Sequence, residues 1–154
     1  MDSDERARLI AQYRDGHREV VEALSGVSEE ELDRSATDDW TPRQIAHHLA
    51  DSEMMSAIRI RRLLTEEEPV IHGYDEMAFA KKLTSDRPIA PSIEAMRWAR
   101  ETSAQLLERM TPEDWRRTGT HSESGPYSAE DWLRIYAAHA HDHAAQIKRA
   151  RGRS

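Results

Sequence analysis

Apolar residues recur every three or four positions in four separate stretches of this chain, which is the spacing of helices that bury one face. The first stretch covers residues 3–24, and Gly26 follows it as a stop signal. The second covers residues 42–64, the third begins near residue 92, and the last follows Ser128. The pattern therefore predicts four long amphipathic helices.

Capping signals support these starting points. Ser28 and Glu31 have the spacing of a capping box and predict one short helical turn. Residues 41–44 (TPRQ) supply a cap, a first-turn proline and a glutamine at the third helical position, so a long helix should begin there. Ser128, with Asp131 three residues on, predicts the start of the last helix.

The segments between the helices predict connections. Residues 66–76 (EEEPVIHGYDE) indicate a loop with a turn of helix after Tyr74, residues 111–115 a single capped turn, and residues 119–126 a loop or small hairpin. No internal repeat or linker interrupts the chain. We therefore predict an all-α four-helix bundle, formed as a single domain over residues 1–154, with a long crossover between the second and third long helices.

Composition excludes several classes of protein. Cysteine is absent, which rules out disulfides, thiolate metal sites and a cysteine nucleophile. Lys and Arg number 22 against 29 for Asp and Glu, and this net charge of −7 argues against nucleic-acid or anionic-membrane partners. No apolar run is long enough to span a bilayer, and the acidic N-terminus is unlike a signal peptide. We expect a cytoplasmic protein that acts on a small molecule.

Histidine gives the strongest functional signal. Eight histidines occur, and five of them lie in two clusters, HHLAD and HAHDH. At about 100° per residue, His48, His139 and His143 fall on the apolar, inward faces of the second and last long helices. On the same reasoning His47 and His141 point to the opposite faces.

Three inward-facing imidazoles need partners, because burying one unbonded polar group costs about 1–3 kcal/mol. Two histidines four residues apart, joined by a third from another helix, favour a divalent metal site with a coordination position left open. Imidazole suits zinc, nickel, copper or iron, and spacing does not choose among them. The alternative is that these histidines lie at the edge of the core and bond to Tyr136, Ser52 or Gln146.

Two stretches also carry a resemblance. DDWTPRQIAHHLADSEMMSAIRIRRLLTEEEPVIHGY and SAEDWLRIYAAHAHDHAAQI resemble the second and fourth helices of the DinB/YfiT-like superfamily, and the likeness continues weakly through the third helix. The nearest resemblance is to its YfiT-like metal-dependent hydrolases. It implies a four-helix bundle, often homodimeric, with nickel or zinc held by three histidines. Matched position by position, these are His48, His139 and His143.

The resemblance leaves the chemistry open. It implies either transfer of a low-molecular-weight thiol to small electrophiles, which we favour from sequence, or hydrolysis of a small substrate. A bundle that binds metal or ligand without turnover is a third possibility. Residue 140 is Ala, where the HExxH pattern of metallopeptidases would place a glutamate base, so peptide hydrolysis is disfavoured. Any thiol must come from a small molecule, because the chain has no cysteine.

Other polar residues near the inward faces are secondary candidates. Arg59 is placed to attract a carboxylate, and Gln146 to orient a ligand or a metal-bound water. Asp51 and Asp142 could accept a ring N–H from a metal-binding histidine. We expect His17 to lie outside the site and both His72 and His121 to be exposed in loops. A homodimer is also expected, because three apolar residues of the second long helix fall off the inward stripe: Met54, Ile58 and Leu64.

Overall fold

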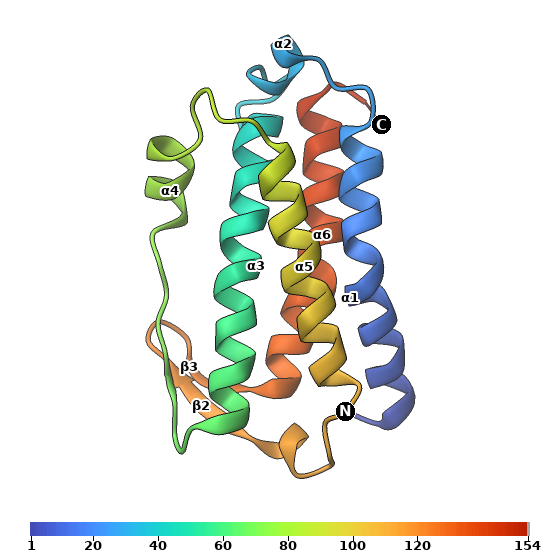
Figure 1. Cartoon of the computed structure of the whole chain (residues 1–154). Helices are drawn as coiled ribbons and strands as arrows, with labels where there is room; N and C mark the ends of the chain where they lie inside the picture. The colour runs from blue at the N-terminus through green and yellow to red at the C-terminus, as the bar shows by residue number, and fades with distance from the viewer. Residues whose placement is uncertain (154) are drawn as a thin grey trace.

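The computed structural model describes residues 1–153 and sets four long helices side by side (Figure 1). These helices are α1 (Ser3–Leu24), α3 (Pro42–Thr65), α5 (Ala90–Leu107) and α6 (Ala129–Ala150). In Figure 1, α1 and α6 run upward from the N-terminal end of the bundle, whereas α3 and α5 run downward. The predicted four-helix bundle is confirmed.

The predicted crossover between α3 and α5 follows from this topology. Two successive parallel helices require a connection that returns along the whole bundle, and residues 66–89 provide it (Figure 1). This segment contains strand β1 (Val70–Ile71) and helix α4 (Glu76–Lys82), so it holds more structure than the expected loop with one turn. Helix α4 lies against α3, where the Gln44 side chain donates a hydrogen bond to the carbonyl of Ala80 at 3.4 Å.

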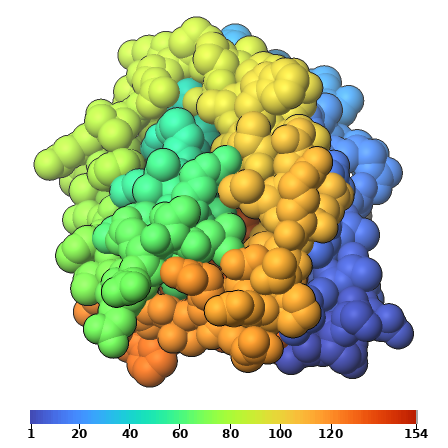
Figure 2. Space-filling view, turned by 60° about the horizontal axis from the view of Figure 1, so that its bottom comes forward, coloured from blue at the N-terminus to red at the C-terminus, as the bar shows by residue number. Residues whose placement is uncertain are grey.

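A small sheet closes the lower end of the bundle. Strands β2 (Thr118–His121) and β3 (Gly125–Ser128) form an antiparallel hairpin, and β1 pairs with β2 in parallel. The hairpin agrees with one of the two alternatives for residues 119–126, whereas the pairing with β1 was not predicted. Figure 2 shows this end of the molecule, with the connection between α5 and α6 (orange) lying between α3 (green) and α1 (blue).

The predicted capping boxes are all present. The Ser28 and Glu31 pair caps the short helix α2 (Glu29–Leu32), the Thr41 hydroxyl accepts from the Gln44 backbone, and Ser128 accepts from the backbone of Asp131. The capped turn near residue 111 is the 3-10 helix η1 (Asp114–Arg116). None of the helices within residues 1–153 combines the length and the apolar character that crossing a membrane requires.

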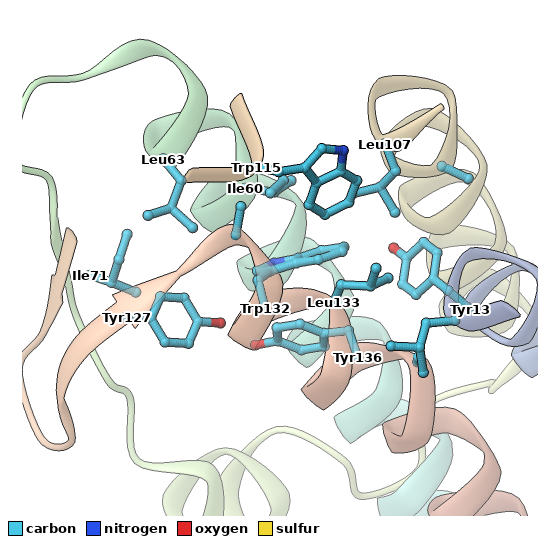
Figure 3. Packing of buried hydrophobic residues seen from close by; sticks show 14 residues of the cluster. Tyr13, Ile60, Leu63, Ile71, Leu107, Trp115, Tyr127, Trp132, Leu133 and Tyr136 are labelled. Carbon is cyan, nitrogen blue, oxygen red and sulfur yellow. The ribbon is translucent and has the colours of Figure 1, made fainter. Parts of the chain in front are cut away.

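The buried core divides into two apolar clusters. The lower one packs aromatic rings of α1 and α6 with aliphatic side chains of α3 (Figure 3). The upper one is mainly aliphatic and joins the C-terminal halves of α1 and α6 to the N-terminal half of α3. On α3 and α5, buried polar residues come in the sequence between the residues of the upper cluster and those of the lower cluster. We call four of them the polar layer: Glu53 and Ser56 on α3, Arg100 and Ser103 on α5.

Arg100 connects all four long helices through the polar layer. Its guanidinium donates hydrogen bonds to the Glu53 carboxylate on α3, to the Tyr13 carbonyl on α1 and to the Tyr136 carbonyl on α6. Gly16 makes room for it, since a Cβ at that position would lie 2.5 Å from Nη1 of Arg100. The polar layer is therefore closely fitted to one charged side chain.

Candidate metal centre

The structure brings together the three histidines that the turn angle selected. His48 comes from the N-terminal half of α3, and His139 and His143 come from successive turns of α6. One ring nitrogen from each lies within 4.8 Å of the others. Nε2 of His48 and Nε2 of His139 are 3.4 Å apart. We call these three residues the histidine cluster.

The donor set of the histidine cluster fits a divalent metal ion. Metal–nitrogen bonds of about 2.0–2.1 Å in a tetrahedral site place two donor atoms about 3.3–3.4 Å apart, which matches the separation of the His48 and His139 nitrogens. Three protein nitrogens leave a fourth position open, as in catalytic rather than structural zinc sites. The cluster is also largely buried, with His48 only 3% exposed.

The electrostatic surroundings keep the imidazoles neutral, which is the form that binds metal. Burial and, to a smaller extent, the nearby His143 lower the pKa of His48 to about 4. Burial also lowers the pKa of His139 strongly, with smaller contributions from His143 and His48. The pKa of His143 is lowered by burial as well, although its hydrogen bond to Gln146 acts in the opposite direction.

Gln146 determines which nitrogen of His143 is available. The Gln146 amide nitrogen donates to Oδ2 of Asp39 at 2.7 Å, which fixes the orientation of the amide. Its oxygen then accepts the Nδ1–H of His143 at 2.7 Å, leaving Nε2 of that ring as the free acceptor. Gln146 was predicted to orient a ligand or a water, and the structure places it against a ring of the histidine cluster.

Glu53 lies behind His139 and was missed by the sequence reasoning. Its side chain is fully buried, and its Oε1 lies 4.0 Å from Nδ1 of His139. Burial raises the pKa of the Glu53 carboxyl, and the Arg100 guanidinium opposes that shift. The available signal was a glutamate on α3 near the inward stripe, with an inward-facing arginine of opposite charge on α5.

Asp51 and Asp142, which the sequence suggested as acceptors of a ring N–H from the metal-binding histidines, do not make such a hydrogen bond. Asp142 is exposed, and Oδ2 of Asp51 is buried without a hydrogen-bond partner. Neither makes a hydrogen bond to a ring of the histidine cluster among residues 1–153. The polar side chains beside the rings of His143 and His139 are instead Gln146 and Glu53.

Arg59 approaches the histidine cluster through Tyr136. Its guanidinium donates to the Tyr136 hydroxyl at 2.8 Å and to the backbone carbonyl of His72 at 2.8 Å. The Tyr136 ring packs edge-on to His139, with ring centres 5.8 Å apart. The role predicted for Arg59, attraction of a carboxylate, stays a prediction.

The remaining histidines lie outside the cluster, and His121 alone departs from its predicted exposure. His47 does not face solvent: it is 1% exposed, accepts from the Ser92 hydroxyl at 2.8 Å and donates to the Arg87 carbonyl at 3.2 Å. His121 is half-buried against the ring of Tyr127 rather than exposed. The others agree with expectation or bond elsewhere: His17 on α1, the exposed His72, and His141, which donates to the Gln12 carbonyl.

An open cavity of about 430 Å³ borders the histidine cluster on one side. His143 and Gln146 line it, together with residues that include Trp40, Gln44 and Met77. The Trp40 ring also packs edge-on to His48, with ring centres 5.0 Å apart. A small molecule could therefore reach the cluster from the side where α4 and the segment before α3 face α6.

Three neutral histidines that converge from two helices of a four-helix bundle are typical of metal-binding helical proteins. The family model of the DinB superfamily matches residues 12–147. The chain belongs to the DinB superfamily, in agreement with the resemblance seen in its sequence.

Relatives cover most of the chain. A protein of Oceanobacillus iheyensis named "Putative metal-dependent hydrolase" is 37% identical over 139 residues, which is 90% of this chain and 81% of that protein. A protein of Bacillus mycoides with the same description is 31% identical over 147 residues, covering 95% of this chain and 85% of its own length.

Two solved structures share the fold to different degrees. YfiT from Bacillus subtilis, described as a probable metal-dependent hydrolase with an unusual four-helix bundle topology, superposes with a TM-score of 0.91 at 29% identity over 100% of this chain and 91% of that one. A mycothiol-dependent maleylpyruvate isomerase superposes with a TM-score of 0.65 at 18% identity, over 96% of this chain and 61% of that one. The second likeness concerns the fold alone.

Proposed function

We propose that this protein is a metal-dependent hydrolase of a small substrate, with a divalent ion held by His48, His139 and His143. The observation that carries the proposal is the convergence of three neutral ring nitrogens beside an open cavity. The description of the relatives from Oceanobacillus iheyensis and Bacillus mycoides supports hydrolysis over the thiol transfer that we favoured from sequence.

The residues of the site have different roles. When bound, a divalent ion supplies Lewis-acid chemistry that polarises a carbonyl group or activates water. The three histidines bind it, and Gln146 holds the His143 ring in the tautomer that leaves Nε2 free. The Trp40 ring packs against His48 and lines the cavity from which a substrate would approach. Nickel or zinc is the metal we propose, because the resemblance to the DinB/YfiT-like superfamily implies one of them and imidazole nitrogen suits both.

The cavity has a size that suits a small molecule. Its volume of about 430 Å³ lies within the range of about 300–1,000 Å³ that is usual for small-ligand sites. The position that carries a glutamate base in HExxH peptidases is Ala140, which is buried in the upper apolar cluster. We therefore propose an ester or amide of a small molecule rather than a peptide.

Thiol transfer is the competing activity, and a single assay separates the two. Metal-loaded protein is given p-nitrophenyl acetate and small amides, and separately a haloarene, each with and without mycothiol, bacillithiol or glutathione. We expect cleavage that requires metal but not thiol, that is lost in His48→Ala, and that is retained in His141→Ala. Thiol-dependent loss of the haloarene without hydrolysis would instead support a transferase, and tight ligand retention without turnover would support a binding protein.

A further inference from the structure

The polar layer contains a buried ion pair in direct reach of the histidine cluster. The Arg100 and Glu53 side chains are 2% and 0% exposed, and Nη2 of Arg100 lies 2.8 Å from Oε1 of Glu53. Nε of Arg100 donates to the same oxygen at 3.0 Å. The other carboxylate oxygen accepts from the hydroxyls of Ser56 at 3.3 Å and Tyr13 at 3.4 Å. Every partner of this carboxylate is itself inside the core.

The stability of the fold alone does not account for such a pair. Removing two charges from water costs several kcal/mol for each, and apolar replacements of similar volume are often neutral or stabilising. The pair also requires Gly16 in the middle of α1, where alanine would form a more stable helix. A feature with these costs, located between two apolar clusters, points to a role outside the packing of the core.

His139 lies next to the ion pair and has a ring nitrogen without a hydrogen-bond partner among residues 1–153. Its Nδ1 is buried and has no hydrogen-bond partner, and it lies 4.0 Å from the oxygen of Glu53 that Arg100 holds. The equivalent nitrogen of His143 is already bonded to Gln146. The two α6 members of the histidine cluster therefore differ at Nδ1, where one has an amide oxygen and the other faces a carboxylate.

We propose that Glu53 is a positioning residue for the metal centre: as His139 turns Nε2 to the ion, its Nδ1–H moves from 4.0 Å into hydrogen-bond distance of the Glu53 carboxylate, which accepts it. Arg100 holds the carboxylate in place by donating to it from α5 while anchored to the carbonyls of Tyr13 and Tyr136. Carboxylates behind metal-binding histidines fix the tautomer and raise the basicity of the ring. This inference rests on the proposed metal site.

The direct test is Glu53→Gln, which keeps the volume and removes the charge. Zn²⁺ affinity is measured by competition with a chromophoric chelator, and Co²⁺ is used to record the visible absorption spectrum. We expect the Zn²⁺ Kd to rise about 10–100-fold, with a changed Co²⁺ spectrum and an unchanged stoichiometry. The matched control is Tyr13→Phe, which removes a hydrogen bond to the other oxygen of the same carboxylate and should leave the Kd and the spectrum as in the wild type.

A second variant separates positioning from folding. In Glu53→Met/Arg100→Met, an apolar pair of similar size replaces the ion pair. The urea concentration at the unfolding midpoint of the metal-free protein should be at least as high as that of the wild type. We expect its Zn²⁺ Kd to stay raised as in Glu53→Gln. Recovery of wild-type affinity in this double variant would show that the ion pair acts only on stability, and would overturn the proposal. If Glu53→Gln does not fold, this variant decides alone.

His48→Ala distinguishes a failure of this inference from a failure of the proposed function. If Zn²⁺ binding is lost in His48→Ala but both Glu53 variants bind with wild-type affinity, the histidine site stands and the role of Glu53 is wrong. If His48→Ala binds Zn²⁺ as the wild type does, the metal site is wrong and the inference fails with it.

Discussion

The Nδ1–H of His143 is bonded to the side-chain oxygen of Gln146 at 2.7 Å, so this ring is held in place before any ion arrives. The Asp39 carboxylate holds the amide in turn, at 2.7 Å from its nitrogen. A donor that is already oriented loses less conformational freedom when it binds a ligand. Gln146 therefore contributes to metal affinity without contacting the metal.

Replacing Gln146 by leucine should weaken metal binding. Gln146→Leu removes the acceptor that fixes the His143 tautomer, and we expect the Zn²⁺ Kd to rise by about 10–100-fold while one ion is still bound per chain. Competition against a chromophoric chelator measures this change. The same substitution at Gln105, an exposed residue of α5 bonded to Glu101, is the control and should leave the Kd unchanged. Equal affinities in the two variants would contradict the role of Gln146.

Replacing Gly16 by alanine tests the packing of Arg100, because the close packing predicts a lower free energy of unfolding where helix propensity alone predicts a higher one. In the middle of an exposed helix, alanine is more stable than glycine by about 0.5–1 kcal/mol. At this position, however, a Cβ would lie 2.5 Å from Arg100 Nη1 and 2.6 Å from Ala140 Cβ. We expect Gly16→Ala to lower the free energy of unfolding by about 1–3 kcal/mol, measured by urea denaturation. A stabilised variant would mean that Arg100 is not packed as described.

Local sequence signals predicted the framework of the fold, because they act within a few residues. The boxes at Ser28, Thr41 and Ser128 each need only a hydroxyl and a polar side chain three residues on, and all three are present. The histidine cluster could also be expected, since a rigid turn angle fixes which face of a helix each residue occupies.

Features that depend on distant segments were not predicted. The pairing of β1 with β2 joins residues about fifty positions apart, and no local pattern specifies it. The contact of Glu53 with Arg100 depends on how α3 and α5 are set against each other. His47 points away from the histidine cluster as expected, but the chain near Ser92 covers that face of α3. Turn angle alone does not distinguish a face toward solvent from a face toward another segment.

His47 should therefore matter for stability and not for metal binding. Its ring bonds to Ser92 and to the carbonyl of Arg87, and removing it leaves buried polar groups unpaired at a cost of about 1–3 kcal/mol. We expect His47→Ala to unfold at lower urea concentration and to retain one metal ion per chain. Loss of the metal from a folded His47→Ala protein would contradict this separation of roles.

The outer face of α3 bears on assembly. Met54 and Ile58 are 47% and 58% exposed and lie one turn apart, whereas Leu64 packs against the lower apolar cluster and is not part of this surface. We predict a homodimer that covers Met54 and Ile58, with twice the 17.7 kDa chain mass by light scattering. Met54→Ser/Ile58→Ser should shift the mass to that of one chain. A wild-type mass of 17.7 kDa at micromolar concentration would contradict the prediction.

The most direct test of the account is the metal content of single histidine variants, measured by elemental analysis after gel filtration. His48→Ala, His139→Ala and His143→Ala should each lose most of the bound metal, because two imidazoles hold a divalent ion weakly. His141→Ala makes the same change on α6, at a residue bonded to the Gln12 carbonyl outside the cluster, and should keep about one ion per chain. Equal metal content in all four variants would contradict a site built from His48, His139 and His143.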